Sequence, residues 1–239
     1  MNTSLDPNQD GRKMNQVIEN KIKYGSIRLL VTLGFALLLG GCAVLPERGG
    51  EPQQWRLVAP APVVEGTDVS DPVIVRLIET RAASAIDRRD MAYSRERQSL
   101  AYYRDNRWTS PPGVMLNEII DETLSTQPWV RTVVRGGARV PSDLSLYCEI
   151  QRLEHQLEPG AAMTQSGQVQ MKVACSWYRA AERQLVEAII FNETIELEAN
   201  DAESYAKGAQ SLVDQLMTRL AAQGASLAAT TTPLPSATD

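Results

Sequence analysis

"LSLYCEIQRL" (residues 144–153) and "VQMKVACSWY" (residues 169–178) are two segments in which apolar and polar residues alternate. Successive side chains of a β-strand point to opposite faces, so this period of two predicts two strands with one apolar face each. The segment between them, "EPGAAMTQSG" (residues 158–167), carries the Gly, Pro and Ser residues that are typical of turns. The two strands are therefore expected to pair as an antiparallel hairpin.

The register of this hairpin is suggested by its cysteines. If Cys148 faces Cys175, then Leu146 faces Trp177, and the other apolar residues of the two strands also meet one another. Directly opposed residues have Cβ atoms about 4.5 to 5.5 Å apart, and a disulfide needs about 3.5 to 4.5 Å. A small adjustment would close the bond, so we hypothesise a Cys148–Cys175 disulfide. The alternative is a pair of buried thiols that pack as small hydrophobic groups.

The residues around the hairpin predict further strands and two amphipathic helices. The expected strands are at 71–80, 90–108 (two short strands with a turn near 95–98), 129–135 and 184–197. Apolar residues recur at helical spacing from Leu116 to Leu124 and from Tyr205 to Leu220. The order of strands, helix, strands and helix predicts an α+β fold, in which a mainly antiparallel or mixed β-sheet carries both helices on one face.

The start of the chain has the layout of a secreted lipoprotein. An apolar run from Leu29 to Leu39 follows a basic stretch, and it is shorter than the roughly 20 residues of a membrane-spanning helix. It ends in Leu39-Gly40-Gly41-Cys42, which resembles the bacterial lipoprotein box, whose cysteine is lipidated and becomes the new N-terminus. The alternative is an ordinary membrane anchor with an incidental cysteine. Residue 43 is Ala, not the Asp that usually retains such proteins in the inner membrane, so the resemblance implies an outer-membrane protein facing the periplasm.

This interpretation divides the chain into four parts. Residues 1–41 are the predicted signal peptide, and 42–54, rich in Pro, Gly and charge, are a flexible tether. Residues 55–223 are the expected folded domain, and 224–239 are small, polar and Pro-containing, which predicts a disordered tail. The only non-protein group expected is the diacylglycerol and N-acyl lipid, such as palmitate, on Cys42.

Composition and motifs favour binding over catalysis. The net charge of −5 on 239 residues gives no basis for nucleic-acid binding. Three cysteines and one histidine are too few for a Cys/His metal cluster. The sequence has no nucleophile elbow, phosphate-binding loop or dinucleotide fingerprint. His155 is expected to be a solvated strand residue rather than a catalytic base. We therefore predict a protein that is not an enzyme and that needs no metal or cofactor.

The mature chain resembles the ABC-type transport auxiliary lipoprotein family. The resemblance rests on motifs in a fixed order: Ile86-Asp87-Arg88, Ala92-Tyr93-Ser94, Leu100-Ala101-Tyr102-Tyr103, Arg107-Trp108, Pro111-Pro112 and the helix from Leu116 to Leu124. The opening "WRL" at Trp55 resembles the family's Tyr-x-Leu strand, and the lipoprotein box and last helix match in order. The chain departs from the family at Ser84 and Ala85, where a Pro and an aromatic residue are common.

This resemblance implies a non-catalytic auxiliary component of an ABC transport system that works with an MCE (mammalian cell entry) protein. Such systems move phospholipid or other hydrophobic molecules across the envelope. The implied partners are the MCE-domain protein and the permease/ATPase complex, and the resemblance allows a homo-oligomeric ring. Tyr102, Tyr103 and Trp108 are candidate contact residues, because amphipathic aromatic side chains suit interfaces; the alternative for each is core packing.

Two other classes of function stay open from the sequence. One is an outer-membrane assembly or lipopolysaccharide-handling lipoprotein that binds a β-barrel partner. The other is a periplasmic enzyme, which would need a polar cleft that the sequence does not indicate.

Overall fold

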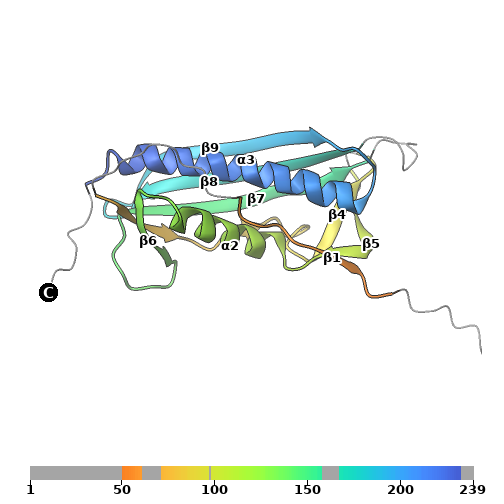
Figure 1. The fold of residues 1–239 in the computed structure, drawn as a ribbon, viewed down its shortest axis with the longest axis horizontal. Helices are drawn as coiled ribbons and strands as arrows, with labels where there is room; N and C mark the ends of the chain where they lie inside the picture. Colours follow the sequence, from red (N-terminus) through yellow and green to blue (C-terminus); the bar gives the residue numbers. More distant parts are fainter. Residues whose placement is uncertain (1–49, 61–70, 97, 158–166, 233–239) are drawn as a thin grey trace, which may run out of the picture. The chain divides into compact units, whose positions relative to one another are not determined.

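The computed structural model describes residues 50–60, 71–96, 98–157 and 167–232. Within these ranges a nine-stranded sheet is combined with two helices (Figure 1). The strands are β1 (Gln53–Trp55), β2 (Val73–Leu77), β3 (Arg81–Ala82), β4 (Asp90–Ser94), β5 (Ala101–Trp108), β6 (Val130–Arg135), β7 (Leu144–Gln156), β8 (Gln168–Arg179) and β9 (Gln184–Glu196). The helices are α2 (Pro112–Ser125) and α3 (Ala202–Ala228).

The sheet is assembled on β7. On one side β7 pairs antiparallel with β8 along nearly its whole length, and β8 pairs antiparallel with β9. On its other side β7 pairs in parallel with three shorter strands in succession, β2, β3 and β4. β6 extends the sheet beyond β2, while β5 and then β1 extend it beyond β4. The sheet is therefore mixed, with its longest pairings antiparallel, and the predicted α+β class is confirmed.

The predicted register of the hairpin is confirmed at three rungs: Leu146–Trp177, Cys148–Cys175 and Ile150–Val173. Beyond Ile150 the register shifts at a β-bulge before Arg152. A bulge places one extra residue in one strand, so the alternation changes face. From there on Leu153 and His155 continue the buried side of β7, while Arg152 is exposed.

Both helices lie on one face of the sheet, as predicted (Figure 1). α2 begins at Pro112, where the missing N–H removes no helical hydrogen bond. α3 is capped by Asp201, whose side chain accepts a hydrogen bond from the backbone N–H of Ser204 at 2.7 Å. α3 packs on β8 and β9 and also contacts α2, so the two helices form one layer over the sheet.

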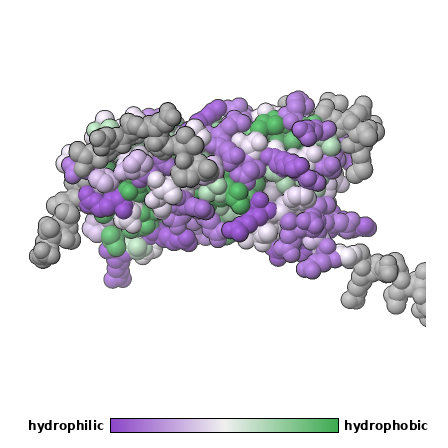
Figure 2. Space-filling model, viewed as in Figure 1, coloured by the Kyte–Doolittle hydropathy of each residue, from purple (hydrophilic) through white to green (hydrophobic). Residues whose placement is uncertain are grey.

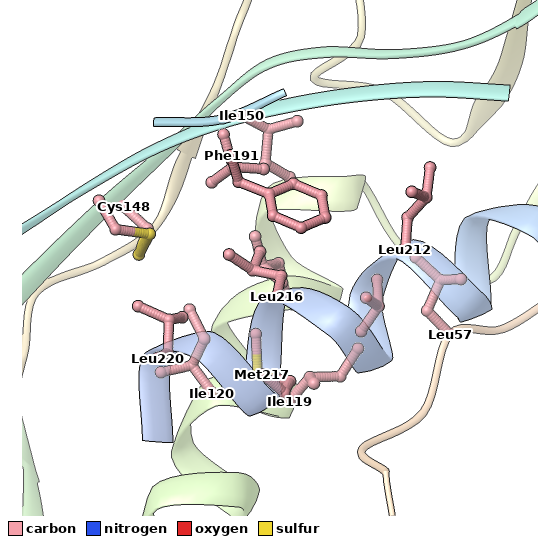
Figure 3. Close-up of a cluster of buried hydrophobic side chains, with 14 of the residues drawn as sticks. Leu57, Ile119, Ile120, Cys148, Ile150, Phe191, Leu212, Leu216, Met217 and Leu220 are labelled. Atoms are coloured by element: carbon pink, nitrogen blue, oxygen red, sulfur yellow. A yellow bond between two sulfur atoms is a disulfide. The ribbon is translucent and has the colours of Figure 1, made fainter. Parts of the chain in front are cut away.

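The core fills the space between this helical layer and the sheet (Figure 3). Leu216 and Met217 of α3 lie beside Ile120 of α2, and Phe191 of β9 approaches them from the sheet. Burying one such side chain contributes about 1.5 to 3 kcal/mol. The core therefore joins the end of the chain to its middle, and α3 cannot be removed without exposing the apolar face of the hairpin.

α3 continues beyond the predicted end of the domain. The expectation that a disordered tail begins at residue 224 is wrong for residues 224–228, which form the last turns of the helix. Gly224, Ala225 and Ala228 are buried there. Small side chains give little hydrophobic pattern in the sequence, but here they let the helix approach Trp129, which is fully buried. Residues 1–49 and 233–239 lie outside the described residues.

Replacing Gly224 with Ala tests this close packing. Ala favours a helix over Gly by about 1 kcal/mol. However, a Cβ at position 224 would lie 2.3 Å from Cη2 of Trp129, and overpacking of a core costs about 1 to 3 kcal/mol. We expect G224A to lower the free energy of unfolding by about 1 kcal/mol, measured by urea denaturation.

The matched control is Ser211→Ala on the exposed side of α3, which is expected to leave stability unchanged or slightly higher. A G224A protein as stable as the wild type would show that the end of α3 does not pack on Trp129.

Candidate functional site

The three aromatic residues predicted to contact a partner all belong to β5, but the structure gives them different environments. Trp108 is 1% exposed, and its ring packs edge-on against the ring of Tyr205 with centroids 5.5 Å apart. Trp108 is therefore a core residue and presents no surface to a partner. Core packing was the alternative at this position, and α3 provides it.

Tyr103 is half-buried and is held by an internal contact. Its hydroxyl lies 2.7 Å from Nδ1 of His155, and the two rings stack with centroids 6.2 Å apart. The ring of Tyr93 lies 5.1 Å away on its other side. Burial raises the pKa of Tyr103, so its hydroxyl stays protonated. Tyr103 therefore links β5 to β7 and does not extend freely into solvent.

His155 is fully buried, which corrects the prediction of a solvated residue. The β-bulge after Ile150 turns it inward, beneath the ring of Tyr205 at 5.6 Å. Its Nε2 and Oδ1 of Asn200 both lie within 2.4 Å of the place that a Cβ on Gly167 would take, so a larger residue has no room there. Burial lowers the pKa of His155 from 6.5 to about 4, while Asn200 and Asp201 act weakly in the opposite direction.

Tyr102 is the predicted contact residue that reaches the surface. The guanidinium of Arg88 lies 4.4 Å from the centre of its ring, and the Tyr102 hydroxyl donates to the backbone oxygen of Ala85 at 2.8 Å. Nε of Arg88 in turn contacts Oδ2 of Asp90 at 2.6 Å. We call Tyr102, Arg88 and Asp90 the Tyr102 cluster. Sequence reasoning missed Arg88, although it belongs to the Ile86-Asp87-Arg88 motif.

Cys148 and Cys175 are joined by a disulfide in the structure, with an S–S distance of 2.04 Å. Both residues are buried between the sheet and the helices, and Cys148 lies at the edge of the core cluster in Figure 3. The bond ties β7 to β8 at the middle of their pairing. Because both cysteines are buried in the core, the bond links the two strands from inside the fold.

These observations define a class of protein. It is a disulfide-linked α+β domain with helices on one face of its sheet and a polar surface over those helices (Figure 2). Among the residues that the structure describes, His, Cys, Asp and Glu side chains form no group that could hold a metal ion. The described helices include none that is long and apolar enough to cross a membrane. The class is thus defined by its fold: a disulfide-linked α+β domain with a mixed sheet.

The chain belongs to a family of this class, the ABC-type transport auxiliary lipoprotein components, whose family model matches residues 55–221. The match begins where the folded domain was expected to begin. It ends inside α3, before the last turns of that helix. A comparison with curated proteins finds no match.

Two solved structures share the fold. One is the crystal structure of protein XCC0632 from Xanthomonas campestris, with 16% sequence identity and a TM-score of 0.63, covering 72% of this chain and 94% of that one. The other is a crystal structure of an uncharacterized protein, with 13% identity and a TM-score of 0.55, covering 72% of this chain and 98% of that one. At these identities the likeness establishes the fold alone.

The disulfide predicts resistance to alkylation. In denaturant without reductant, iodoacetamide should leave Cys148 and Cys175 unmodified, and after reduction it should label both, as read by mass spectrometry. The bond closes a loop between residues separated by 27 positions, so reduction should lower the free energy of unfolding by about 3 to 4 kcal/mol.

The control is the Cys148→Ala, Cys175→Ala double variant, whose stability should not respond to reductant. Two labelled thiols before reduction would contradict the bond.

His155 predicts a specific loss of stability in acid. Its pKa is about 4 in the folded protein against an ordinary value of 6.5, so between these values the unfolded chain binds more protons. Above pH 6.5 protonation of His155 does not reduce the free energy of unfolding. As the pH is lowered toward 4, the free energy of unfolding falls, because the unfolded chain takes up the proton more readily. Between pH 7.5 and pH 5 we expect the free energy of unfolding to fall by about 2 kcal/mol from this group.

His155→Gln cannot titrate, so its stability should fall less over the same range in urea denaturation. Equal pH slopes for the variant and the wild type would show that His155 is not desolvated. Because the chain has a single histidine, no other imidazole contributes to the difference.

Proposed function

We propose that this protein is the outer-membrane-anchored, periplasmic and non-catalytic auxiliary component of an MCE-type ABC transport system. That system would move phospholipid or other hydrophobic molecules across the envelope. The observation that carries the proposal is the family match over residues 55–221, which spans most of the described domain. The auxiliary component would dock the periplasmic MCE protein at the outer membrane.

The anchor of this arrangement is lipid on Cys42, which lies outside the described residues. The box Leu39-Gly40-Gly41-Cys42 supports lipidation, and Ala43 supports export to the outer membrane. The chain is acidic, with a net charge of −5, so electrostatic attraction to anionic lipid cannot hold it on the membrane. Stable attachment therefore needs more than one acyl chain. The Cys148–Cys175 disulfide suits the oxidising periplasm.

The Tyr102 cluster is the proposed contact with the MCE protein. It combines an aromatic ring with a cation and a carboxylate, and the side chains of Arg88 and Asp90 are 50% and 38% exposed. Tyr and Arg are enriched among the residues that dominate binding energy. Tyr103, the next residue of β5, contacts His155 of β7 and so helps to hold β5 in position. The cluster is thus a preorganised surface, whose side chains lose little freedom on binding.

A pull-down of the full-length chain tests the assignment. Tagged protein recovered from detergent-solubilised envelopes should carry an MCE protein with its permease and ATPase, identified by mass spectrometry. Replacing Tyr102 and Arg88 together by Ala should reduce recovery of the MCE protein about tenfold, the effect expected of a residue pair that dominates an interface. Cys42→Ser should remove the protein from the outer-membrane fraction.

The matched control is Arg104→Ala. Arg104 lies on the same strand as Tyr102, its side chain is 89% exposed, and its recorded ion pair is with the adjacent Asp105. Its loss should not change recovery. A pull-down that yields a β-barrel protein and no MCE protein would overturn the transport assignment in favour of outer-membrane assembly.

A further inference from the structure

The face of the sheet opposite the helices is divided into a polar half and an apolar half. The polar half lies toward the end of β7 and is built from three cross-strand rows: Arg152–Lys172–Asn192, Glu154–Gln170–Thr194 and Gln156–Gln168–Glu196. The other half lies toward the β8–β9 turn, with the rows Ser145–Tyr178–Leu185, Tyr147–Ser176–Ala188 and Glu149–Ala174–Ile190. The helices do not cover this face, so the difference is a property of the protein surface.

The apolar half exposes side chains that a solvated sheet would not need. Ile190 is 72% exposed and Leu185 is 53% exposed, both on β9. Tyr178 pairs with Leu185, and Tyr147 lies on the same face of β7; both tyrosines are half-buried. In contrast, the face that carries the helices is mainly hydrophilic, with only small separate hydrophobic areas in the described residues (Figure 2). Contiguous exposed apolar surface commonly marks a binding site.

A cavity of about 330 Å³ opens on this apolar half. Tyr147, Tyr178 and Ile78 form apolar walls, and the backbone N–H of Ile78 donates to the oxygen of Leu146, which brings the end of β2 alongside β7. Arg179 and Arg183 also line the cavity, where β8 turns toward β9. The volume falls in the range of small-molecule sites, about 300 to 1,000 Å³.

The charge of this cavity is opposite to that of the chain. Two arginines line it and no carboxylate does, whereas the chain carries a net charge of −5. Within the described ranges neither arginine belongs to a recorded ion pair, and the one recorded hydrogen bond of Arg179 is a long one of 3.4 Å to the oxygen of Thr230. Arg183 has a φ of 54°, a conformation in which Gly or Asn would be less strained.

We propose that this cavity and the apolar half of the open face bind an anionic phospholipid. The arginines Arg179 and Arg183 would pair with the phosphate, since guanidinium groups match phosphate oxygens with two hydrogen bonds each. Tyr147, Tyr178 and Ile190 would cover the first part of an acyl chain. Apolar walls favour a lipid over a free phosphate ion, and the two cations favour an anionic head group over a purely apolar ligand. This inference rests on the proposed transport function and names the subunit's own ligand.

The test uses the full-length chain in a neutral detergent with a photoactivatable phosphatidylglycerol as probe. Crosslinks, mapped by mass spectrometry, should fall on the segments 145–147 and 176–190. Arg179→Gln with Arg183→Gln should reduce labelling about tenfold, because both charge-assisted contacts are lost. Unlabelled phosphatidylglycerol should compete, and phosphatidylcholine should compete more weakly.

The matched control is Arg104→Gln with Arg131→Gln, two exposed arginines on β5 and β6 outside this cavity, which should not change labelling. Urea denaturation of both double variants checks that each remains folded. Labelling of the Arg179/Arg183 variant at the wild-type level, or crosslinks outside the open face, would overturn the proposal. If inorganic phosphate abolished labelling by the phosphatidylglycerol probe, the cavity would be a site for a free anion and not for a lipid. Crosslinks between two copies of the chain through Ile190 would show that the open face is a self-association surface instead.

The outcomes separate this inference from the transport assignment. A wild-type protein that recovers the MCE protein but shows no specific labelling of the open face would overturn the lipid proposal alone. Specific labelling of the open face without recovery of an MCE protein would overturn the transport assignment and leave a lipid-binding lipoprotein.

Discussion

The fold depends on the pairing of β7 with β8 in a single register. A shift of one residue would move Leu146, Cys148 and Ile150 to the opposite face, where the helices could not cover them. The disulfide closes at the middle of this pairing and excludes such a shift. The short strands on the other side of β7 make only a few backbone contacts each, so their position follows from that of β7. The N-terminal part of the domain is therefore built on a scaffold that comes later in the chain.

Because α2 and α3 cover one face of this scaffold, they leave its other face uncovered. α2 and α3 bury the apolar side of the hairpin, and the residues between those buried positions form the open face. The same alternation of side chains that makes the core thus also sets the spacing of Tyr147 and Tyr178 on the exposed side.

The sequence predicted those features that have a local cause. Alternation predicted the hairpin strands, the two cysteines within them suggested the register, and helical spacing predicted both helices. What it missed depends on contacts between distant segments. The β-bulge after Ile150 reverses the alternation and buries His155, and its one trace in "EIQRLEHQ" is that Leu153 follows Ile150 by three residues. The end of α3 buries mainly small residues, and Gly224 packs closely against Trp129 there. The cavity forms only when Ile78 is brought beside Tyr147, so no local pattern in the sequence groups Arg179 and Arg183 with them.

The two candidate surfaces lie at opposite ends of the same strand. The Tyr102 cluster adjoins the end of β7 through β4, where Tyr93 pairs with His155, and the arginine cavity adjoins its beginning, where Ser145 pairs with Tyr178. Ten residues of strand separate these points, a distance of about 30 Å. Binding at one of two sites so far apart does not change the affinity of the other, unless the strand between them can adopt two conformations. The disulfide-linked hairpin between them is rigid, so a protein partner at one end and a lipid at the other could be held at once, in a fixed relative position.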